Sequence, residues 1–275
     1  MAQTDSFGDR LKAYEALDTS RKAFKGQPII ARLDGRAFHT FTQGLKRPFD
    51  ERLTRLMIDT TKHLVDRFGA AAGYCQYDEI TLAWFVDSSS QSEYVFDGRF
   101  QKMDSLLAAS ASVYFNRQLD FYLPEKAALE LMPIFDCRAF VVPNLLEAYH
   151  CFLWRQQDCT MNAISTAAQS MFSHKSLQGM SGPQMIERMH EERKVVFDFL
   201  DDRFRLGTFA RRTKVLMPMA PEVVEKLHLL GKPVDSTKLV ERSVIETCSV
   251  PLRDLEDPIG FLFKGGSAAT KALDP

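Results

Sequence analysis

Two short apolar runs, each ending in an acidic residue, constrain this chain more than any other feature of its sequence. The run at residues 29–33 leads directly to Asp34, and the run at 74–77 leads to Asp78 and Glu79. A further apolar run follows Glu79 at once. Short runs of this kind, rich in β-branched and aromatic residues, predict β-strands. The pattern therefore predicts strands that end in acids, with the second pair of acids in a tight turn.

The acidic ends of these strands suit a divalent cation. Mg²⁺ prefers hard oxygen ligands, usually one or two carboxylates together with substrate phosphates. Two such ions can stabilise both the attacking and the leaving oxygen of a phosphoryl transfer. Acids at strand ends are also ordinary turn residues, so each site taken alone has that simpler explanation.

The expected elements alternate between strands and helices. Apolar periodicity predicts helices at residues 6–17, 49–68 and 99–119, and strands at 28–33, on both sides of Asp78, and at 134–142. The segment at 34–47 contains two glycines and is expected to be a loop. The resulting order, β-α-β-β-α-β, is the split βαβ of ferredoxin-like folds and the core of polymerase palm domains. In a palm, metal-binding acids occupy the two places where Asp34 and Asp78 lie.

The second half of the chain is expected to extend this core. Asn144, followed three residues later by a glutamate, is a good start for a long helix that runs to about residue 172. A further helix is expected at 184–200, and the tail mixes prolines, basic residues and short β-like runs. We therefore expect an α+β protein with a ferredoxin-like palm core at 1–142 and a helical and β extension at 143–275. The extension is not expected to be an independent domain.

Composition narrows the functional classes. The 275 residues are 45% hydrophobic, and their net charge of -1 means that any nucleic acid must be bound by a local basic patch. No apolar run approaches the roughly 20 residues of a membrane span, and the start of the sequence has no apolar secretory core. The five cysteines form no C-x-x-C pair, so neither a zinc site nor a disulfide framework is indicated. We expect a cytoplasmic protein without a membrane partner.

Basic residues close to the expected acids could hold phosphates. Gly35 would let the backbone approach a ligand, and the amides from Arg36 to His39 could cradle phosphate oxygens. Arg99 and Lys102 share a face at the start of an expected helix, which favours a triphosphate. Simpler explanations stay open, since His39 could be a surface loop residue and the two cations could be solvated charges.

Other polar clusters offer contacts for an RNA backbone. The segment from Trp154 to Asp158 is unusually polar for an apolar helix, and both a buried Arg–Asp network and a substrate contact remain open there. At Asp50, helix capping is a sufficient explanation. The best local basic patches are formed by His174, Lys175, Arg211, Arg212 and Lys214.

Five ordered segments resemble the tRNA-His guanylyltransferase superfamily, whose members add nucleotides in the 3′-to-5′ direction. The similarity extends along nearly the whole chain. The segments are Ile30 to His39, Gln76 to Glu79, Phe135 to Arg138, Trp154 to Cys159, and Arg205 to Thr208. Together these ordered motifs are far more specific than any one of them.

The resemblance implies roles for the matching residues. Asp34, Asp78 and Glu79 would be the catalytic acids, and two Mg²⁺ ions would be held by Asp34, Asp78 and the carbonyl group of Gly35. RNA contacts would come from Arg155 and from Asn162, in addition to the basic patches. A homotetramer is expected, because family members commonly assemble as dimers of dimers. ATP, GTP or another nucleoside triphosphate would be bound by Arg36, Ala37, Phe38, His39, Arg47, Asp50, Tyr77, Arg99 and Lys102.

Three departures from the family pattern refine this resemblance. The enzymes that act on tRNA-His carry a His-Ile-Asn-Asn segment where this chain has Thr160, although Asn162 keeps an asparagine. Tyr77 stands where a serine is usual. Arg47 stands where a lysine is usual, which keeps the charge but presents a planar fork. The missing histidine resembles the bacterial and archaeal branch that repairs truncated tRNA 5′ ends by templated addition.

The sequence therefore predicts a Mg²⁺-dependent nucleotidyltransferase that extends the 5′ end of RNA, with truncated tRNA as its expected substrate. A 5′-monophosphate would first need adenylylation by ATP. One alternative is a dedicated tRNA-His guanylyltransferase, and another is a nucleotide cyclase, which uses the same palm without RNA. A third is a non-catalytic ferredoxin-like RNA-binding module, which would present aromatic residues on its central strands.

Overall fold

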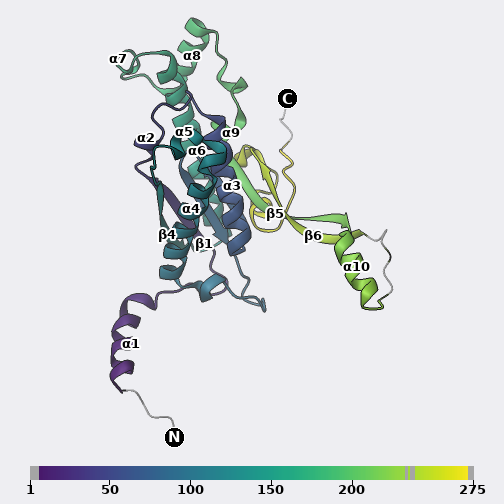
Figure 1. Ribbon diagram of the computed structural model, residues 1–275. Coiled ribbons are helices and arrows are strands. Elements are labelled where there is room, and N and C mark those ends of the chain that lie inside the picture. Colours follow the sequence, from purple (N-terminus) through teal and green to yellow (C-terminus); the bar gives the residue numbers. More distant parts are fainter. Residues whose placement is uncertain (1–5, 233–234, 236–238, 272–275) are drawn as a thin grey trace.

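The centre of the molecule is a six-stranded sheet with the strand order β4-β1-β3-β2-β5-β6, in which neighbouring strands are antiparallel. The computed structural model describes residues 6–232, 235 and 239–271 (Figure 1). Two helices connect the first four strands in the order β-α-β-β-α-β, which is the split βαβ of a ferredoxin-like palm. The expected α+β fold is therefore confirmed. These elements are β1 (Ile29–Arg36), α3 (Glu51–Phe68), β2 (Ala72–Gln76), β3 (Glu79–Trp84), α4 (Phe100–Tyr122) and β4 (Ile134–Val141).

The side chains of β1 alternate between two helical layers, as the two-residue period of a strand requires. Ile29 and Leu33 are buried in a cluster with side chains of α3 and α4. Ile30 belongs instead to a cluster with side chains of the long helix α6 (Leu145–Met171). Asp34 lies an even number of residues from Ile30, so it faces the side of the sheet that α6 covers.

Helix α3 begins and ends as its sequence indicates. Asp50 caps the first turn, where its side chain accepts a hydrogen bond from the amide of Arg52 at 3.0 Å. Gly69 follows the last turn with a left-handed φ of 62°, which costs a glycine little. Between these ends, an apolar face that includes Leu56 and Leu64 is buried against the sheet.

The second half of the chain continues the palm sheet. Asn144 caps α6 as expected, because its side chain accepts a hydrogen bond from the amide of Glu147 at 2.9 Å. Strand β5 (Thr208–Pro218) pairs with β2, and β6 (Leu239–Cys248) pairs with β5. The other helices are α1 (Ser6–Thr19), α2 (Phe38–Phe41), α5 (Pro124–Ala127), α7 (His174–Leu177), α8 (Gly182–Arg193), α9 (Asp202–Leu206), α10 (Pro221–Leu229) and α11 (Pro258–Phe263), with 3₁₀ turns at Val95–Gly98, Phe197–Phe199 and Leu252–Asp254.

Several boundaries differ from the expectations. Strand β1 runs on through Gly35, and the segment expected to be a loop contains the short helix α2. The helix expected at 184–200 is α8, which ends at Arg193 because Lys194 adopts a left-handed φ of 57°. Strand β6 has no counterpart among the expected elements.

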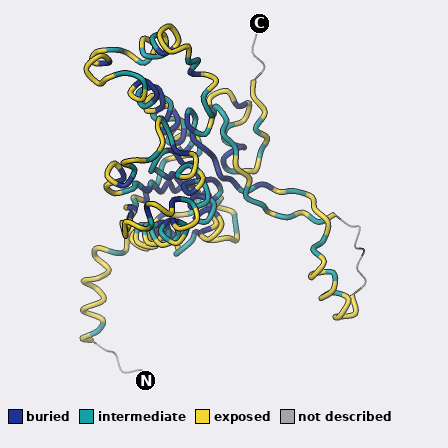
Figure 2. Tube along the Cα trace, turned by 45° about the horizontal axis from the view of Figure 1, so that its top comes forward, coloured by how far each residue is buried: buried dark blue, intermediate teal, exposed yellow. Residues whose placement is uncertain are grey.

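Two parts of the chain project from the body of the molecule. Helix α1 and the distal end of the β5–β6 hairpin, with α10 at its tip, extend away from the sheet (Figure 1). Neither α1 nor α10 has a buried residue, and both are mostly exposed in Figure 2. Among the described residues, no helix has the length and apolar character needed to cross a membrane.

Candidate active site

The two acidic turns meet at one end of the central strands, as the sequence predicted. Asp34 is the register partner of Glu79 on β3 and of Asp136 on β4. Beyond this pair, the amide of Gly35 donates a hydrogen bond to the carbonyl oxygen of Asp78 at 3.1 Å. Antiparallel pairing of β1 with β3 therefore brings Asp34 and Asp78 to neighbouring positions.

Both turns contain a non-glycine residue with left-handed backbone. Tyr77 has a φ of 46° in the two-residue hairpin between β2 and β3, and Ala37 has a φ of 58° before α2. Each such residue costs on the order of 1–2 kcal/mol. The ring of Tyr77 packs edge-on against Phe204, with 6.1 Å between ring centroids, and this contact helps to hold the turn. Backbone strain of this kind is concentrated at functional sites.

The acids form an electrostatically unfavourable group. Burial raises the pKa of Asp78 to about 6, and the nearby negative charges of Asp34 and Glu79 act in the same direction. Asp34 is more exposed, and its closest cation is Arg138, whose guanidinium nitrogen lies 3.9 Å from the carboxylate. Among the described residues, two carboxylates therefore lie close together without a cation that fully compensates them.

Glu79 differs from the two aspartates because it has a dedicated partner. The buried guanidinium of Arg155 on α6 donates a hydrogen bond to Oε1 of Glu79 at 3.3 Å and another to Asp158 at 2.6 Å. Burial raises the pKa of Glu79, while the charges of Arg155 and Arg32 oppose that rise. Arg155 therefore fixes Glu79 in place and leaves Asp34 and Asp78 to face a ligand.

The donor set at this site fits Mg²⁺. In the described part of the chain, no group of three or more His, Cys, Asp or Glu side chains is arranged to hold a metal ion. Two carboxylates and a backbone carbonyl suit Mg²⁺, which takes its other ligands from water and substrate phosphates. A cation between Asp34 and Asp78 would also relieve the repulsion that helps to raise the pKa of Asp78. These two acids are thus the residues that would hold Mg²⁺ arriving with a nucleotide.

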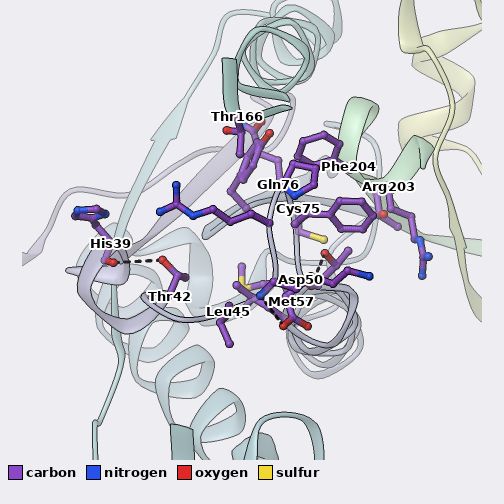
Figure 3. A pocket seen from close by; sticks show the side chains of 18 of the residues that line it. His39, Thr42, Leu45, Asp50, Met57, Cys75, Gln76, Thr166, Arg203 and Phe204 are labelled. Carbon is purple, nitrogen blue, oxygen red and sulfur yellow. Dashed lines mark hydrogen bonds between the residues drawn. The ribbon is translucent and has the colours of Figure 1, made fainter. Parts of the chain in front are cut away.

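A cavity of about 350 Å³ lies next to the hairpin that carries Asp78, since Gln76 and Tyr77 of that hairpin line it (Figure 3). Its volume is in the range of small-molecule sites. Four of the residues expected to bind nucleotide line it, namely His39, Arg47, Asp50 and Tyr77. Its wall is completed by Thr42, Leu45, Lys46, Pro48, Phe49, Leu53, Thr54, Met57, Cys75, Gln76, Thr166, Gln169, Arg203, Phe204 and Thr208.

A second cavity, of about 320 Å³, shares part of its lining with the first. Asp78 and Glu79 line it from the hairpin, and Asn162 lines it from α6. Both cavities share Gln76, whose Oε1 is buried without a hydrogen-bond partner. Buried polar atoms without partners are rare in proteins. The amide oxygen of Gln76 is therefore available to a ligand at the boundary of the two cavities. Ser165 completes the second wall with residues shared with the first cavity: Tyr77, Thr166 and Gln169.

Thr166 and Gln169 were missed by sequence reasoning. They follow Asn162 at i+4 and i+7, so the three side chains share one face of α6. That polar stripe on a long, otherwise apolar helix was the signal that could have identified them. Gln76 belongs to the recognised segment Gln76 to Glu79 but was not expected to be a site residue. Arg203 and Phe204 were also missed, and no local pattern distinguishes them.

The loop after Asp34 contributes unevenly to the site. Arg36 and His39 are exposed, and Ala37 is exposed at the strained turn. Phe38 is buried among aromatic rings of the core, including Phe115 at 5.4 Å between centroids. The expected contact of Phe38 with a nucleotide can therefore involve only its backbone.

Asp50 is already committed to other groups. Its carboxylate accepts hydrogen bonds from the amides of Lys46 and Arg52 and from the guanidinium of Arg52. The Arg52 side chain is the main cause of a pKa lowered to about 2. Its position in the cavity wall is fixed by this capping role.

Arg99 and Lys102 lie far from the acids of the same chain, and their expected contact with a triphosphate stays a prediction. Ser112 Oγ on α4 accepts a hydrogen bond from the amide of Phe135, the residue before the β4 partner of Asp34. Lys102 precedes Ser112 by ten residues, which is ~15 Å along a helix axis. Arg99 lies farther still, where it bridges to Lys22 before β1. Sequence reasoning recognised the helix start correctly but could not predict which end of the sheet it would occupy.

The expected RNA contacts divide into buried and exposed groups. Arg155 and Arg211 are buried, and Arg211 pairs with Glu246 at 3.1 Å, so neither presents its charge to an RNA backbone. This is a correction, and its cause is that both guanidiniums satisfy partners inside the fold. His174, Lys175 and Lys214 are exposed, Arg212 is half-buried against Asp66, and Asn162 lies beside the acids.

Comparisons with known proteins find similar sequences and similar solved structures. A family profile described as "Thg1: tRNAHis guanylyltransferase" matches residues 8–143. The chain is 34% identical to a solved bacterial tRNA(His) guanylyltransferase (Thg1)-like protein in complex with ATP, with a TM-score of 0.70, covering 75% of this chain and 88% of the other. A second bacterial Thg1-like structure, in complex with GTP, has 27% identity and a TM-score of 0.65, covering 88% and 91%.

Relatives of known sequence extend the similarity to eukaryotes and a virus. The chain is 30% identical to the uncharacterized protein R259 of Acanthamoeba polyphaga mimivirus over 70% of this chain and 72% of the relative. It is 31% identical to the tRNA(His) guanylyltransferase of Debaryomyces hansenii over 50% of this chain. That alignment spans 51% of the fungal enzyme, about half its length.

Proposed function

The chain belongs to the Thg1 (tRNAHis guanylyltransferase) family, and from the site described above we propose that it is a Mg²⁺-dependent nucleotidyltransferase that extends the 5′ end of tRNA. One observation carries this proposal. Asp34 and Asp78 are joined through the Gly35 amide, and Tyr77, the residue before Asp78, lines a cavity of nucleotide-binding size. The solved bacterial relatives, in complex with ATP and GTP, support nucleoside triphosphates as substrates.

The proposed reaction is 3′-to-5′ addition. The 3′ oxygen of the incoming nucleotide forms a bond to the α-phosphorus at an activated RNA 5′ end, the bond to the leaving phosphate group breaks, and the hydroxyl proton is released. An RNA that ends in a monophosphate is first adenylylated: an oxygen of its 5′ phosphate attacks the α-phosphorus of ATP and pyrophosphate leaves. AMP is then the group that leaves when the nucleotide is added. When bound, two Mg²⁺ ions would supply electrostatic stabilisation of the attacking and leaving oxygens. The protein contributes alignment and electrostatics, and no covalent nucleophile is needed.

The chain's own residues have distinct parts in this scheme. The carboxylates of Asp34 and Asp78 would hold the cations, and Arg155 keeps Glu79 oriented next to them. The cavity lined by His39, Met57 and their neighbours receives the nucleotide, and the free amide oxygen of Gln76 offers it a hydrogen-bond acceptor.

We further propose that the substrate is truncated tRNA and that base pairing selects the nucleotide. The hydroxyl of Thr160 points inward and shares its single proton between the carbonyl oxygens of Gln156 at 3.2 Å and Arg205 at 3.0 Å. Thr160 stands where the tRNA-His enzymes carry histidine, and its hydroxyl is therefore not free to recognise one particular tRNA. Under this proposal the protein is a tRNA repair enzyme. We propose that it acts in the cytoplasm as a homotetramer. Apolar side chains exposed on α1 could form contacts between subunits and so support an oligomer.

Two alternatives remain distinguishable. The first alternative is a dedicated tRNA-His guanylyltransferase, because the relative from Debaryomyces hansenii is named as one. The non-catalytic RNA-binding module is disfavoured, because such modules stack bases on exposed aromatic residues of their central strands. Here Tyr74 and Trp84, on β2 and β3, are buried.

The test uses 5′-labelled, 5′-truncated tRNAs incubated with each nucleotide and Mg²⁺. The RNAs carry mono- or triphosphate ends, different anticodons and different unpaired acceptor-stem bases. We expect addition of the complementary nucleotide whatever the anticodon, stopping when the stem is complete. Addition of G regardless of the template, or a strong preference for the histidine anticodon, would support the dedicated enzyme instead. Absence of any RNA-dependent addition would overturn the catalytic proposal.

A further inference from the structure

One of the two tryptophans is exposed close to the acids. Trp84 is buried, and its indole N–H donates a hydrogen bond to the carbonyl oxygen of Phe68 at 2.9 Å. Trp154, on α6, is 55% exposed. Large aromatic side chains are usually buried or used at interfaces. An indole left in water at this place is therefore a candidate for contact with a ligand.

Two guanidinium groups support the exposed ring. The guanidinium carbon of Arg155 lies 4.4 Å from the centroid of Trp154, and that of Arg32 lies 5.5 Å from it. Arg155 is itself held by Glu79 and Asp158, so the indole rests on a fixed partner. Cations beside an aromatic ring attract it through its quadrupole and restrict its motion. More than half of the surface of Trp154 nevertheless remains exposed to solvent.

The ring belongs to the same face of the sheet as the catalytic acids. Arg32 and Asp34 are two residues apart on β1, so their side chains point to the same side, ~7 Å apart along the strand. Arg32 is the register partner of Arg138, whose guanidinium is the cation closest to Asp34. On this face of the sheet, Arg32 and Arg138 therefore lie between Trp154 and Asp34.

Arg32 has unused hydrogen-bonding capacity. Its Nε is buried without a hydrogen-bond partner, and Arg138 is 57% exposed. Arginines are well suited to bind phosphate oxygens. The surface between Trp154 and Asp34 therefore combines an aromatic face with donors for phosphate, which is the combination used to bind single-stranded nucleic acid.

We propose that Trp154 is the platform on which the terminal base of the acceptor RNA stacks, so that the adjacent 5′ phosphate reaches Asp34 and Asp78. This inference rests on the proposed function. The occupant is the RNA end rather than the incoming nucleotide, because Trp154 lines neither cavity beside the acids. Stacking is indifferent to base identity, so the platform would accept whichever base ends the truncated strand.

The direct test is tryptophan fluorescence, compared between the wild-type protein and Trp154→Phe. A short acceptor-stem RNA with a recessed 5′ end is titrated in the absence of nucleotide, and ATP alone is titrated in parallel. We expect the RNA to quench a signal that Trp154→Phe lacks, and ATP alone to leave it unchanged. Quenching by ATP but not by RNA would overturn the proposal. So would a Trp154 signal that changes only with protein concentration, because the ring would then lie between copies of the chain.

Kinetics provide a second readout. Trp154→Ala should raise the KM for RNA by about tenfold, within the range measured for lost base–aromatic stacking, and leave the KM for nucleotide unchanged. Trp154→Phe should recover most of the loss.

The matched control is Phe121→Ala, which removes an aromatic ring that is 78% exposed on α4, on the other face of the sheet. An unchanged KM for RNA in Trp154→Ala would refute the platform while leaving nucleotide addition intact. If neither the wild-type protein nor any variant adds nucleotides, the fluorescence titration still decides whether RNA covers Trp154.

Discussion

The amide of Gly35 donates a hydrogen bond to the carbonyl oxygen of Asp78 at 3.1 Å, so the two acidic turns form one hydrogen-bonded unit. The strand pairing of Asp34 with Glu79 continues into this bond. The separation of the two carboxylates is therefore set by the register of the sheet rather than by flexible loops. Sites built on rigid elements hold their geometry better than sites on loops.

Gly35→Ala should disturb this unit. A Cβ at this position would collide with the ring of Phe38, which is wedged among aromatic rings of the core. Overpacking of this kind costs about 1–3 kcal/mol, and the displaced turn should lower nucleotide addition. Chemical unfolding and activity are measured for Gly35→Ala, Phe38→Leu and the double variant. We expect the double variant to be less impaired than the sum of the single changes; strictly additive losses would show that the collision is not the cause.

Asp78→Asn should stabilise the metal-free protein above neutral pH. Burial raises the pKa of Asp78 to about 6 from an ordinary value of 3.8, so the folded state binds its proton more tightly than the unfolded state. Stability is then fully present below the ordinary pKa and is lost as the pH rises through about 6. At pH 8 the variant should be more stable by up to about 3 kcal/mol, since one pKa unit corresponds to about 1.4 kcal/mol. Urea unfolding in EDTA between pH 4 and 8 measures this difference, which should shrink toward pH 4; a difference independent of pH would contradict the assignment.

Arg155→Met should destabilise the fold strongly. The variant leaves Glu79 and Asp158 without their shared cation, and breaking a buried ion pair costs about 3–5 kcal/mol. Adding Glu79→Gln removes the more buried negative charge and should recover much of the loss. Thermal unfolding of the single and double variants is the measurement. An Arg155→Met protein as stable as wild type would mean that the network does not orient Glu79.

Thr166→Phe should obstruct the nucleotide cavity. The larger ring would enter the space of about 350 Å³ that Thr166 lines, and the KM for nucleotide should rise by about tenfold or more, as expected for a loss of at least 1.4 kcal/mol in binding. RNA affinity should stay close to that of the wild type. Met161→Phe is the control, because Met161 is exposed on the same helix and lines neither cavity. Equal effects of the two substitutions would place the nucleotide elsewhere.

The fold and the acids could be predicted because their signals are local. Short apolar runs predicted strands, and strand order then placed Asp34 and Asp78 together. The position of Arg99 could not be predicted, because it depends on the direction in which α4 crosses the sheet. Phe204 was missed because it reaches the cavity only through tertiary packing of α9 beside the hairpin. Thr166 could have been found from the polar stripe that it shares with Asn162 on α6. Arg211 looked like part of a basic patch, but its partners Glu246 and Gly266 lie far along the chain.

The central claim is that Asp34 and Asp78 form the catalytic centre for nucleotide addition. The most direct measurement is the single-turnover rate of addition to a 5′-triphosphorylated, truncated tRNA by Asp34→Ala and Asp78→Ala, with folding of each variant verified by its unfolding transition. We predict that both variants fold and that each loses at least about a thousandfold in rate, since removing one metal-centred charge interaction costs several kcal/mol in the transition state. A folded variant of either acid that retains a rate within a few-fold of wild type would contradict the account.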